Sequence, residues 1–78
     1  MKVRVHVLPK AGALDPQGEA VCHALKSMGF DGVNDVRQGK IIELDVSEET
    51  TRELVVQMCE RLLANSVVES YEIESPLS

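Results

Sequence analysis

The chain has 78 residues, a formal net charge of -5 at pH 7 and a sequence pI near 4.9. This length allows one domain with a small core, and cores of this size are often completed by association with another chain. Acidic side chains outnumber basic ones by 13 to 8 and aromatic residues are 3% of the chain, so binding to nucleic acid is not expected. No run of about 18 apolar residues occurs, so we predict no membrane association and a cytoplasmic location.

A strand is predicted over residues 2–8, where valine alternates with charged and polar residues. This period of two buries one face and leaves the other polar. Residues 9–14 are expected to form a loop, because a proline and a glycine interrupt regular structure there. Asp15 can then cap a helix in which Pro16 occupies the first turn, and apolar residues at helical spacing extend this helix over about 16–28.

A β-hairpin is predicted over residues 33–46, with its turn at Gln38 and Gly39. Gly39 would supply the positive φ angle that a tight hairpin turn requires. The second arm alternates apolar and acidic residues, as a strand with one buried face does, and we expect it to be central in the sheet.

A second helix is predicted from the apolar spacing within residues 54–63. Two starts remain open: a cap at Ser47, or a capping box formed by Thr50 and Glu53. Asn65 is expected to end this helix in the left-handed conformation, and residues 67–73 are expected to form the last strand.

The element order β-α-β-β-α-β predicts an α+β fold, a two-layer α/β sandwich with a ferredoxin-like antiparallel sheet and both helices on one face. We expect a single domain over residues 1–74 and a flexible tail over 75–78. In this arrangement basic side chains of the first strand oppose Glu43 and Asp45 on the uncovered sheet face, which another subunit could cover.

The side chains that usually carry chemistry form no recognisable constellation. His6 and His23 lack a nucleophile and an orienting acid at a known spacing, and Cys22 and Cys59 match no common zinc or redox spacing. We interpret the cysteines as small buried hydrophobes and predict no catalytic, metal-binding or cofactor-binding residue in this chain.

Three blocks of the sequence, residues 10–18, 33–40 and 62–73, resemble the PurS family, the small subunit of the bacterial and archaeal phosphoribosylformylglycinamidine (FGAM) synthase. The blocks have the order and separation of that family, and the resemblance spans nearly the whole chain. Ala11 and Ser66 stand where the family often has proline, which loosens two loops without changing side-chain chemistry.

The resemblance implies a non-catalytic subunit of a ligase of purine biosynthesis. In such a complex a synthetase (PurL-like) subunit uses ATP and Mg, and a glutaminase (PurQ-like) subunit releases ammonia from glutamine. The small subunit, as a homodimer or homotetramer, bridges the two and supports ammonia transfer, and binds no cofactor itself.

Subunit contacts are expected in the first loop and at the predicted hairpin turn, because both are polar or glycine-rich and lie within the resembling blocks. Arg37 and Lys40 could grip a carboxylate or phosphate of another chain, or remain solvated. The candidate interface residues are Gly12, Leu14, Asp15, Pro16, Gln17, Gly18, Arg37, Gly39 and Lys40.

Two other functions remain open from the sequence. A stand-alone oligomeric sensor of a small molecule is compatible with the same topology. An acylphosphatase-like hydrolase ranks lower, because it requires an arginine in the first loop and residues 9–18 contain none.

Overall fold

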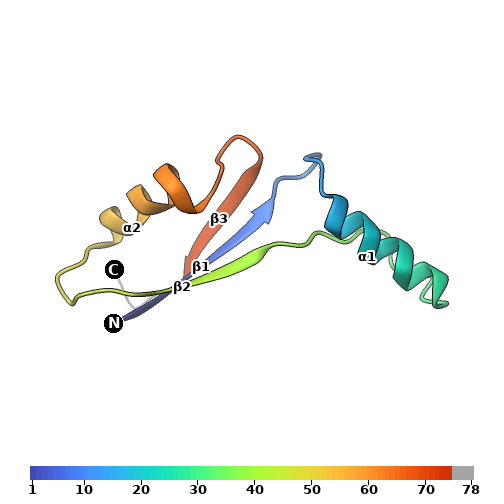
Figure 1. The fold of residues 1–78 in the computed structure, drawn as a ribbon, viewed down its shortest axis with the longest axis horizontal. Coiled ribbons are helices and arrows are strands. Elements are labelled where there is room, and N and C mark those ends of the chain that lie inside the picture. Colours follow the sequence, from blue (N-terminus) through green and yellow to red (C-terminus); the bar gives the residue numbers. More distant parts are fainter. Residues whose placement is uncertain (75–78) are drawn as a thin grey trace.

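The computed structural model describes residues 1–74, so the predicted tail lies outside the described residues. The elements are β1 (Lys2–Pro9), α1 (Pro16–Ser27), β2 (Lys40–Asp45), α2 (Arg52–Met58), the π-helical turn η1 (Cys59–Leu63) and β3 (Glu69–Glu74) (Figure 1). The three strands form one antiparallel sheet in the order β2-β1-β3. The predicted α+β class and antiparallel sheet are confirmed, but the central strand is β1 and not residues 40–46.

The core lies between one face of the sheet and the α2–η1 segment. The valines of β1 point into it, and Val3 and Val5 are completely buried. Val55 of α2 and Cys59 of η1 are also completely buried and belong to the same cluster. The period-2 alternation of β1 therefore defines the inner face of the sheet as predicted.

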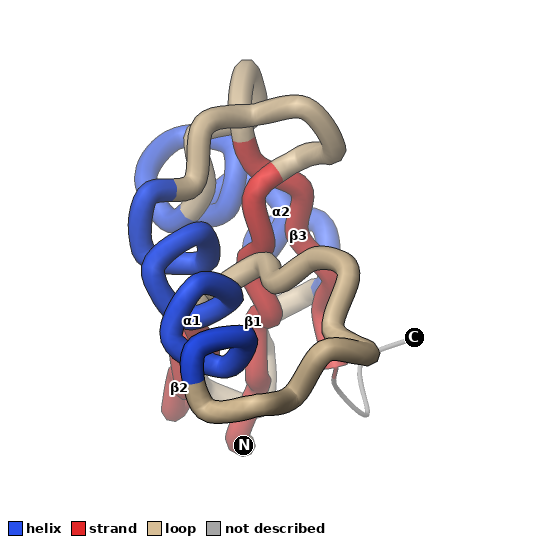
Figure 2. Tube along the Cα trace, turned by 90° about the vertical axis from the view of Figure 1, so that its right-hand side faces the viewer, coloured by secondary structure: helices blue, strands red, loops and turns tan. Residues whose placement is uncertain are grey.

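Helix α1 does not cover the sheet. It stands beyond the end of the strands (Figure 1), and in Figure 2 it is nearest the viewer with the strands and α2 behind it. None of its residues belongs to the core cluster or to the half-buried side chains packed around that cluster. The expectation that both helices lie on one sheet face is therefore met by α2 alone.

The predicted hairpin over 33–46 does not form. Residues 33–39 are not a strand, and the chain returns beside α1 and leads directly into β2 (Figure 1). The start of α1 supplies partners to this segment, since the Gln38 backbone N–H donates to an Asp15 carboxylate oxygen at 2.9 Å. Within the described residues β2 pairs only with β1, so it is an edge strand.

Both ends of α1 agree with the sequence prediction. An Asp15 carboxylate oxygen accepts from the Gly18 backbone N–H at 3.0 Å, which caps the first turn. At the other end Gly29 has a φ of +95°, and the Phe30 backbone N–H donates to the Leu25 carbonyl at 3.0 Å. This is the Schellman arrangement, in which glycine adopts the left-handed conformation without steric cost.

Neither predicted start of the second helix is correct. Ser47 and Thr50 form a turn with their hydroxyl oxygens 3.1 Å apart, and the Thr51 hydroxyl caps α2 by accepting from the Leu54 backbone N–H at 3.3 Å. Asn65 does not adopt a left-handed conformation, because within residues 1–74 only glycines have positive φ. The last strand starts at Glu69, two residues later than expected.

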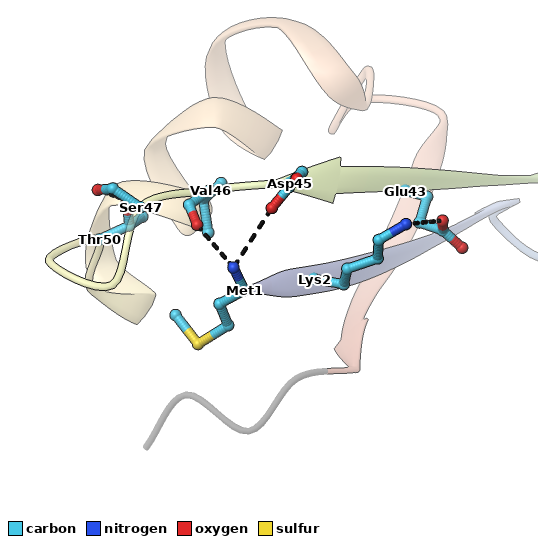
Figure 3. Close-up of polar contacts among 7 residues, drawn as sticks. All are labelled: Met1, Lys2, Glu43, Asp45, Val46, Ser47 and Thr50. Carbon is cyan, nitrogen blue, oxygen red and sulfur yellow. Dashed lines mark hydrogen bonds and ion pairs between the residues drawn. The ribbon is translucent and has the colours of Figure 1, made fainter.

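The outer face of the sheet carries ion pairs. Arg4 Nε and Lys2 Nζ lie 3.2 and 3.5 Å from the Glu43 carboxylate, and the Lys2 contact is drawn in Figure 3. Lys2 first and then Arg4 hold the pKa of Glu43 below its ordinary value. Basic side chains of β1 thus oppose Glu43 of β2 as predicted. His6 of β1 instead contacts the neighbouring strand β3, with its Nε2 2.7 Å from a carboxylate oxygen of Glu74.

The end of β2 is joined to the beginning of β1. The Met1 amino group lies 3.3 Å from Asp45 Oδ1 and 2.9 Å from the Val46 carbonyl oxygen (Figure 3). This end of the sheet is therefore held by polar contacts, while the opposite end carries the loops that lead to and from α1.

Candidate functional site

The loop after β1 and the segment before β2 meet at one end of the sheet, which we call the loop end (residues 9–18, 36–40 and 64–69). Together they line an open hollow of about 630 Å³. Four of the candidate residues lie on its wall, namely Gly12, Leu14, Asp15 and Arg37. The structure therefore brings the two predicted contact regions together, although the hairpin that was to place the second one does not exist.

Asp15 joins these two regions. Its two carboxylate oxygens accept backbone N–H groups from opposite sides, Gly18 at 3.0 Å and Gln38 at 2.9 Å. The Gln38 bond first, and then the Gly18 bond, lower the pKa of Asp15. The Gln17 side-chain oxygen also accepts from Gln38 Nε2 at 3.2 Å. Asp15 is thus an internal connector, with each oxygen already paired.

Gly18 and Gly39 are glycines because of close packing and not because of turn geometry. A Cβ atom on Gly18 would lie 2.5 Å from the Val36 carbonyl oxygen. A Cβ atom on Gly39 would collide with the Val7 carbonyl oxygen and lie 2.8 Å from Leu8 Cδ2. The prediction of a positive φ at Gly39 is wrong, since only Gly12 and Gly29 have one among the described residues.

The two candidate cations do not converge on one ligand. Arg37 Nη1 donates to the Pro9 carbonyl at 3.3 Å, and its side chain borders the hollow of the loop end. Lys40 begins β2 opposite Val7 and lines a separate hollow of about 440 Å³ together with His6 and Ile41. A single carboxylate or phosphate gripped by both cations is therefore not supported by this geometry.

Seven of the nine candidate residues are exposed to solvent, all except Asp15 and Gly18. Leu14 has 84% of its surface exposed, and Pro16 and Gln17 at the start of α1 are exposed as well. An apolar side chain left this open contributes nothing to the core of the chain itself. Leu14 is therefore available for contact with another protein.

Sequence reasoning missed Lys10, although it lies in the first resembling block. Its Nζ donates to the Ser66 carbonyl at 2.7 Å and its backbone N–H donates to the Val68 carbonyl at 2.8 Å. The signal available in the sequence was a lone lysine directly after the end of a strand. Its partners could not be deduced, because they are more than 50 positions away and only the β1–β3 pairing brings them near.

Side chains of metal-ligating types and thiols occur in the described part of the chain. Residues 1–74 contain no group of three or more His, Cys, Asp and Glu side chains placed to hold a metal ion. Cys59 is fully buried, and this burial raises the pKa of its thiol. None of the described helices has the length and apolar character to cross a membrane. Fold and site together define a small α+β protein with a preformed loop surface suited to contacts.

Comparison with known families specifies this class further. The PurS family model, described as Phosphoribosylformylglycinamidine (FGAM) synthase, matches residues 2–76, and the chain belongs to this family. The PurS subunit of Bacillus subtilis (strain 168) is 53% identical over 76 residues, which cover 94% of this chain and 89% of that relative. The PurS subunit of Mycobacterium leprae is 44% identical over 69 residues, which cover 88% and 87%.

Solved structures agree with this assignment. The C2 crystal form of Bacillus subtilis PurS superposes with a TM-score of 0.82 at 52% identity, covering 94% of both chains. A chain of the PurLQS structure from Thermotoga maritima superposes with a TM-score of 0.79 at 36% identity, covering 94% of this chain and 93% of that one. The resemblance seen in the sequence is confirmed.

We predict that Gly39→Ala destabilises the protein by roughly 1–3 kcal/mol, because the added methyl group must displace the Val7 carbonyl or the Leu8 side chain. Gly32→Ala is the matched control, since a Cβ atom there meets nothing within 4 Å and no positive φ is present. The control should be neutral or slightly stabilising. Urea unfolding of both variants at one protein concentration measures the difference, and equal free energies of unfolding would contradict the packing role.

The contacts of Asp15 predict a pH dependence of stability. Because its folded pKa is lowered, its contribution is fully present above the unfolded pKa of about 4 and is lost as pH falls through the folded value. Asp15→Asn keeps one oxygen for the helix cap but cannot accept from Gln38 with the amide nitrogen. We expect the wild type to be more stable than this variant at pH 6 and the difference to shrink towards pH 2. A difference that stays constant over this range in urea unfolding would refute the assignment.

Proposed function

We propose that this chain is the small, non-catalytic subunit of FGAM synthase and that it bridges a synthetase (PurL-like) and a glutaminase (PurQ-like) subunit. The observation that carries the proposal is the likeness, over nearly the whole chain, to a chain of the PurLQS structure from Thermotoga maritima. Membership of the PurS family over residues 2–76 supports it independently. In this role the chain supports the transfer of ammonia from glutamine to the synthetase.

The loop end is the part of this chain that we assign to the partner subunits. Leu14, Pro16, Gln17, Arg37 and Lys40 are exposed there and would make the contacts. Asp15, Gly18 and Gly39 shape this surface through their internal contacts, and Gly12 lies in the first loop with a φ of +84°. A surface held by internal hydrogen bonds and close-packed glycines loses little conformational entropy on binding, which favours affinity.

In this proposal the partner subunits carry out the chemistry of the complex. ATP, Mg and glutamine are used by the other subunits, and the complex acts in the cytoplasm. This chain contributes position and contact area, in line with a loop end whose titratable Asp15 is already paired with backbone donors.

The chain is also proposed to form a homodimer or homotetramer. The segment that follows α1 leaves large apolar side chains in solvent, with Met28 71% and Phe30 55% exposed. The outer edges of β2 and β3 have no strand beside them within residues 1–74. Association would bury this surface and pair these edges. Sedimentation velocity at micromolar concentration should give a mass of at least two chains, and a species of 8.6 kDa alone would contradict the proposal.

Reconstitution with the cognate synthetase and glutaminase subunits tests the function. Glutamine-driven formation of FGAM should require this chain, whereas turnover driven by free ammonia should continue without it, because only the former needs the subunits held together. Arg37→Ala should weaken assembly about tenfold to a hundredfold, the loss expected for a hydrogen bond from a charged group, and Arg52→Ala at the start of α2, outside the loop end, is the matched control. If neither the glutamine-driven rate nor the ammonia-driven rate changes when the chain is left out, the proposal is refuted and a separate sensor function is favoured.

A further inference from the structure

The chain consists of a compact body and a projecting arm. We call residues 14–36, which comprise α1 and the returning segment beside it, the arm (Figure 1). The arm is joined to the body through two short stretches, residues 9–13 and 37–39, which we call the elbow. No residue of the arm takes part in the core. The direction of the arm is therefore set at the elbow and not by packing against the sheet.

Most polar contacts of the elbow are made with other residues of the elbow or of the arm. Arg37 Nη1 donates to the Pro9 carbonyl, which joins the outgoing and returning stretches at 3.3 Å. The Asp15 carboxylate accepts from Gln38, which closes the base of the arm. The Asp15 bond makes the arm with its elbow one unit, and the Arg37 bond ties the returning stretch to Pro9, the last residue of β1. Neither bond reaches the turn between η1 and β3.

Lys10 connects this unit to the body. Its Nζ donates to the Ser66 carbonyl at 2.7 Å, the only side-chain hydrogen bond within residues 1–74 that runs from the arm or elbow to the turn between η1 and β3. The Lys10 backbone N–H adds a bond to the Val68 carbonyl at 2.8 Å. Both acceptors lie in the turn between η1 and β3.

That turn is a firm anchor. Asn65 Oδ1 accepts from the Val67 backbone N–H at 3.2 Å, and the Glu69 carboxylate accepts from the Asn65 backbone N–H at 2.7 Å. Ala64, directly before it, is buried in the core cluster. The Ser66 carbonyl is thus fixed relative to the core, and a lysine bonded to it is fixed as well.

The elbow also contains the means to move if this bond is lost. Gly12 has a φ of +84° and no other part of the chain within 4 Å of its Cβ position. A glycine in open space permits large backbone rotations at small cost. Rotation there would redirect the outgoing stretch towards Leu14 and the start of α1, with loss of the Ala13 N–H bond to the Lys10 carbonyl at 2.9 Å.

We propose that Lys10 is a positioning residue that sets the direction of the arm by holding the elbow to the 65–68 turn, so that the loop end meets the partner subunits as one surface. The proposal rests on the proposed function for its second part only. The first part concerns the free chain and is measurable without any partner.

Lys10→Met tests the proposal, because it keeps the length of the side chain and removes the donor. Lys10→Arg restores a donor in reach of the Ser66 carbonyl, and Lys26→Met on α1 is a control outside the elbow. Spin labels on His23→Cys in α1 and Glu72→Cys in β3 report the arm-to-body distance in a Cys22→Ser background, where the fully buried Cys59 stays unlabelled. Labelled chains are diluted with unlabelled chains so that only distances within one chain contribute.

We expect one narrow distance distribution for the wild type, Lys10→Arg and Lys26→Met, and a distribution at least twice as broad for Lys10→Met. In the reconstituted synthase, Lys10→Met should lower glutamine-driven turnover about fivefold, the ratio that corresponds to one hydrogen bond, with ammonia-driven turnover unchanged. Lys10→Arg should recover most of this loss.

The outcomes separate the two parts. A narrow distribution for Lys10→Met overturns the role of Lys10 in the elbow. A broad distribution with an unchanged glutamine-driven rate overturns its role in presenting the loop end. If glutamine-driven turnover does not need the wild-type chain, the proposed function fails, while the distance measurement still decides whether Lys10 sets the direction of the arm.

Discussion

The alternation of valine with charged residues along β1 is the constraint on which the rest of the structure depends. One face of this strand supplies the valines against which Val55 and Cys59 pack, and the other supplies Lys2 and Arg4 to the ion pairs with Glu43. Because β1 also pairs with both other strands, it links every part of the core. A strand with two different faces and two neighbours organises a sheet of minimal size.

The loop end follows from where β1 stops. The chain leaves the sheet at Pro9, returns at Lys40, and between these points builds an arm that the core does not support. The side chains of Asp15, Arg37 and Lys10 instead form hydrogen bonds with backbone groups of the elbow and of the 65–68 turn. The same side chains that compensate for the missing core contacts thereby give the loop end a defined shape, as the proposed contact with partner subunits requires.

Elements governed by local sequence were predictable. Asp15 with Pro16 and Gly29 gave the limits of α1, and the alternation in residues 2–8 gave β1, because caps and periodicity act over a few residues. The hairpin failed because residues 33–37 look like a strand, but Gln38 directly after them bonds to Asp15 and Gln17 at the start of α1, a competition that no local pattern reveals. The same long-range contacts hid the packing role of Gly39 and the bond from Lys10 to Ser66.

The sequence by itself determined the α+β class, the core-facing valines, the ends of α1 and, through three spaced blocks, membership of the PurS family. The tertiary structure decided that α1 projects from the sheet and that Gly12, Leu14, Asp15 and Arg37 line one hollow. It also decided which candidate residues are displayed and which are internal. These features depend on atoms brought together from distant positions in the chain, where the free energy of a contact depends on geometry that periodicity and propensity do not specify.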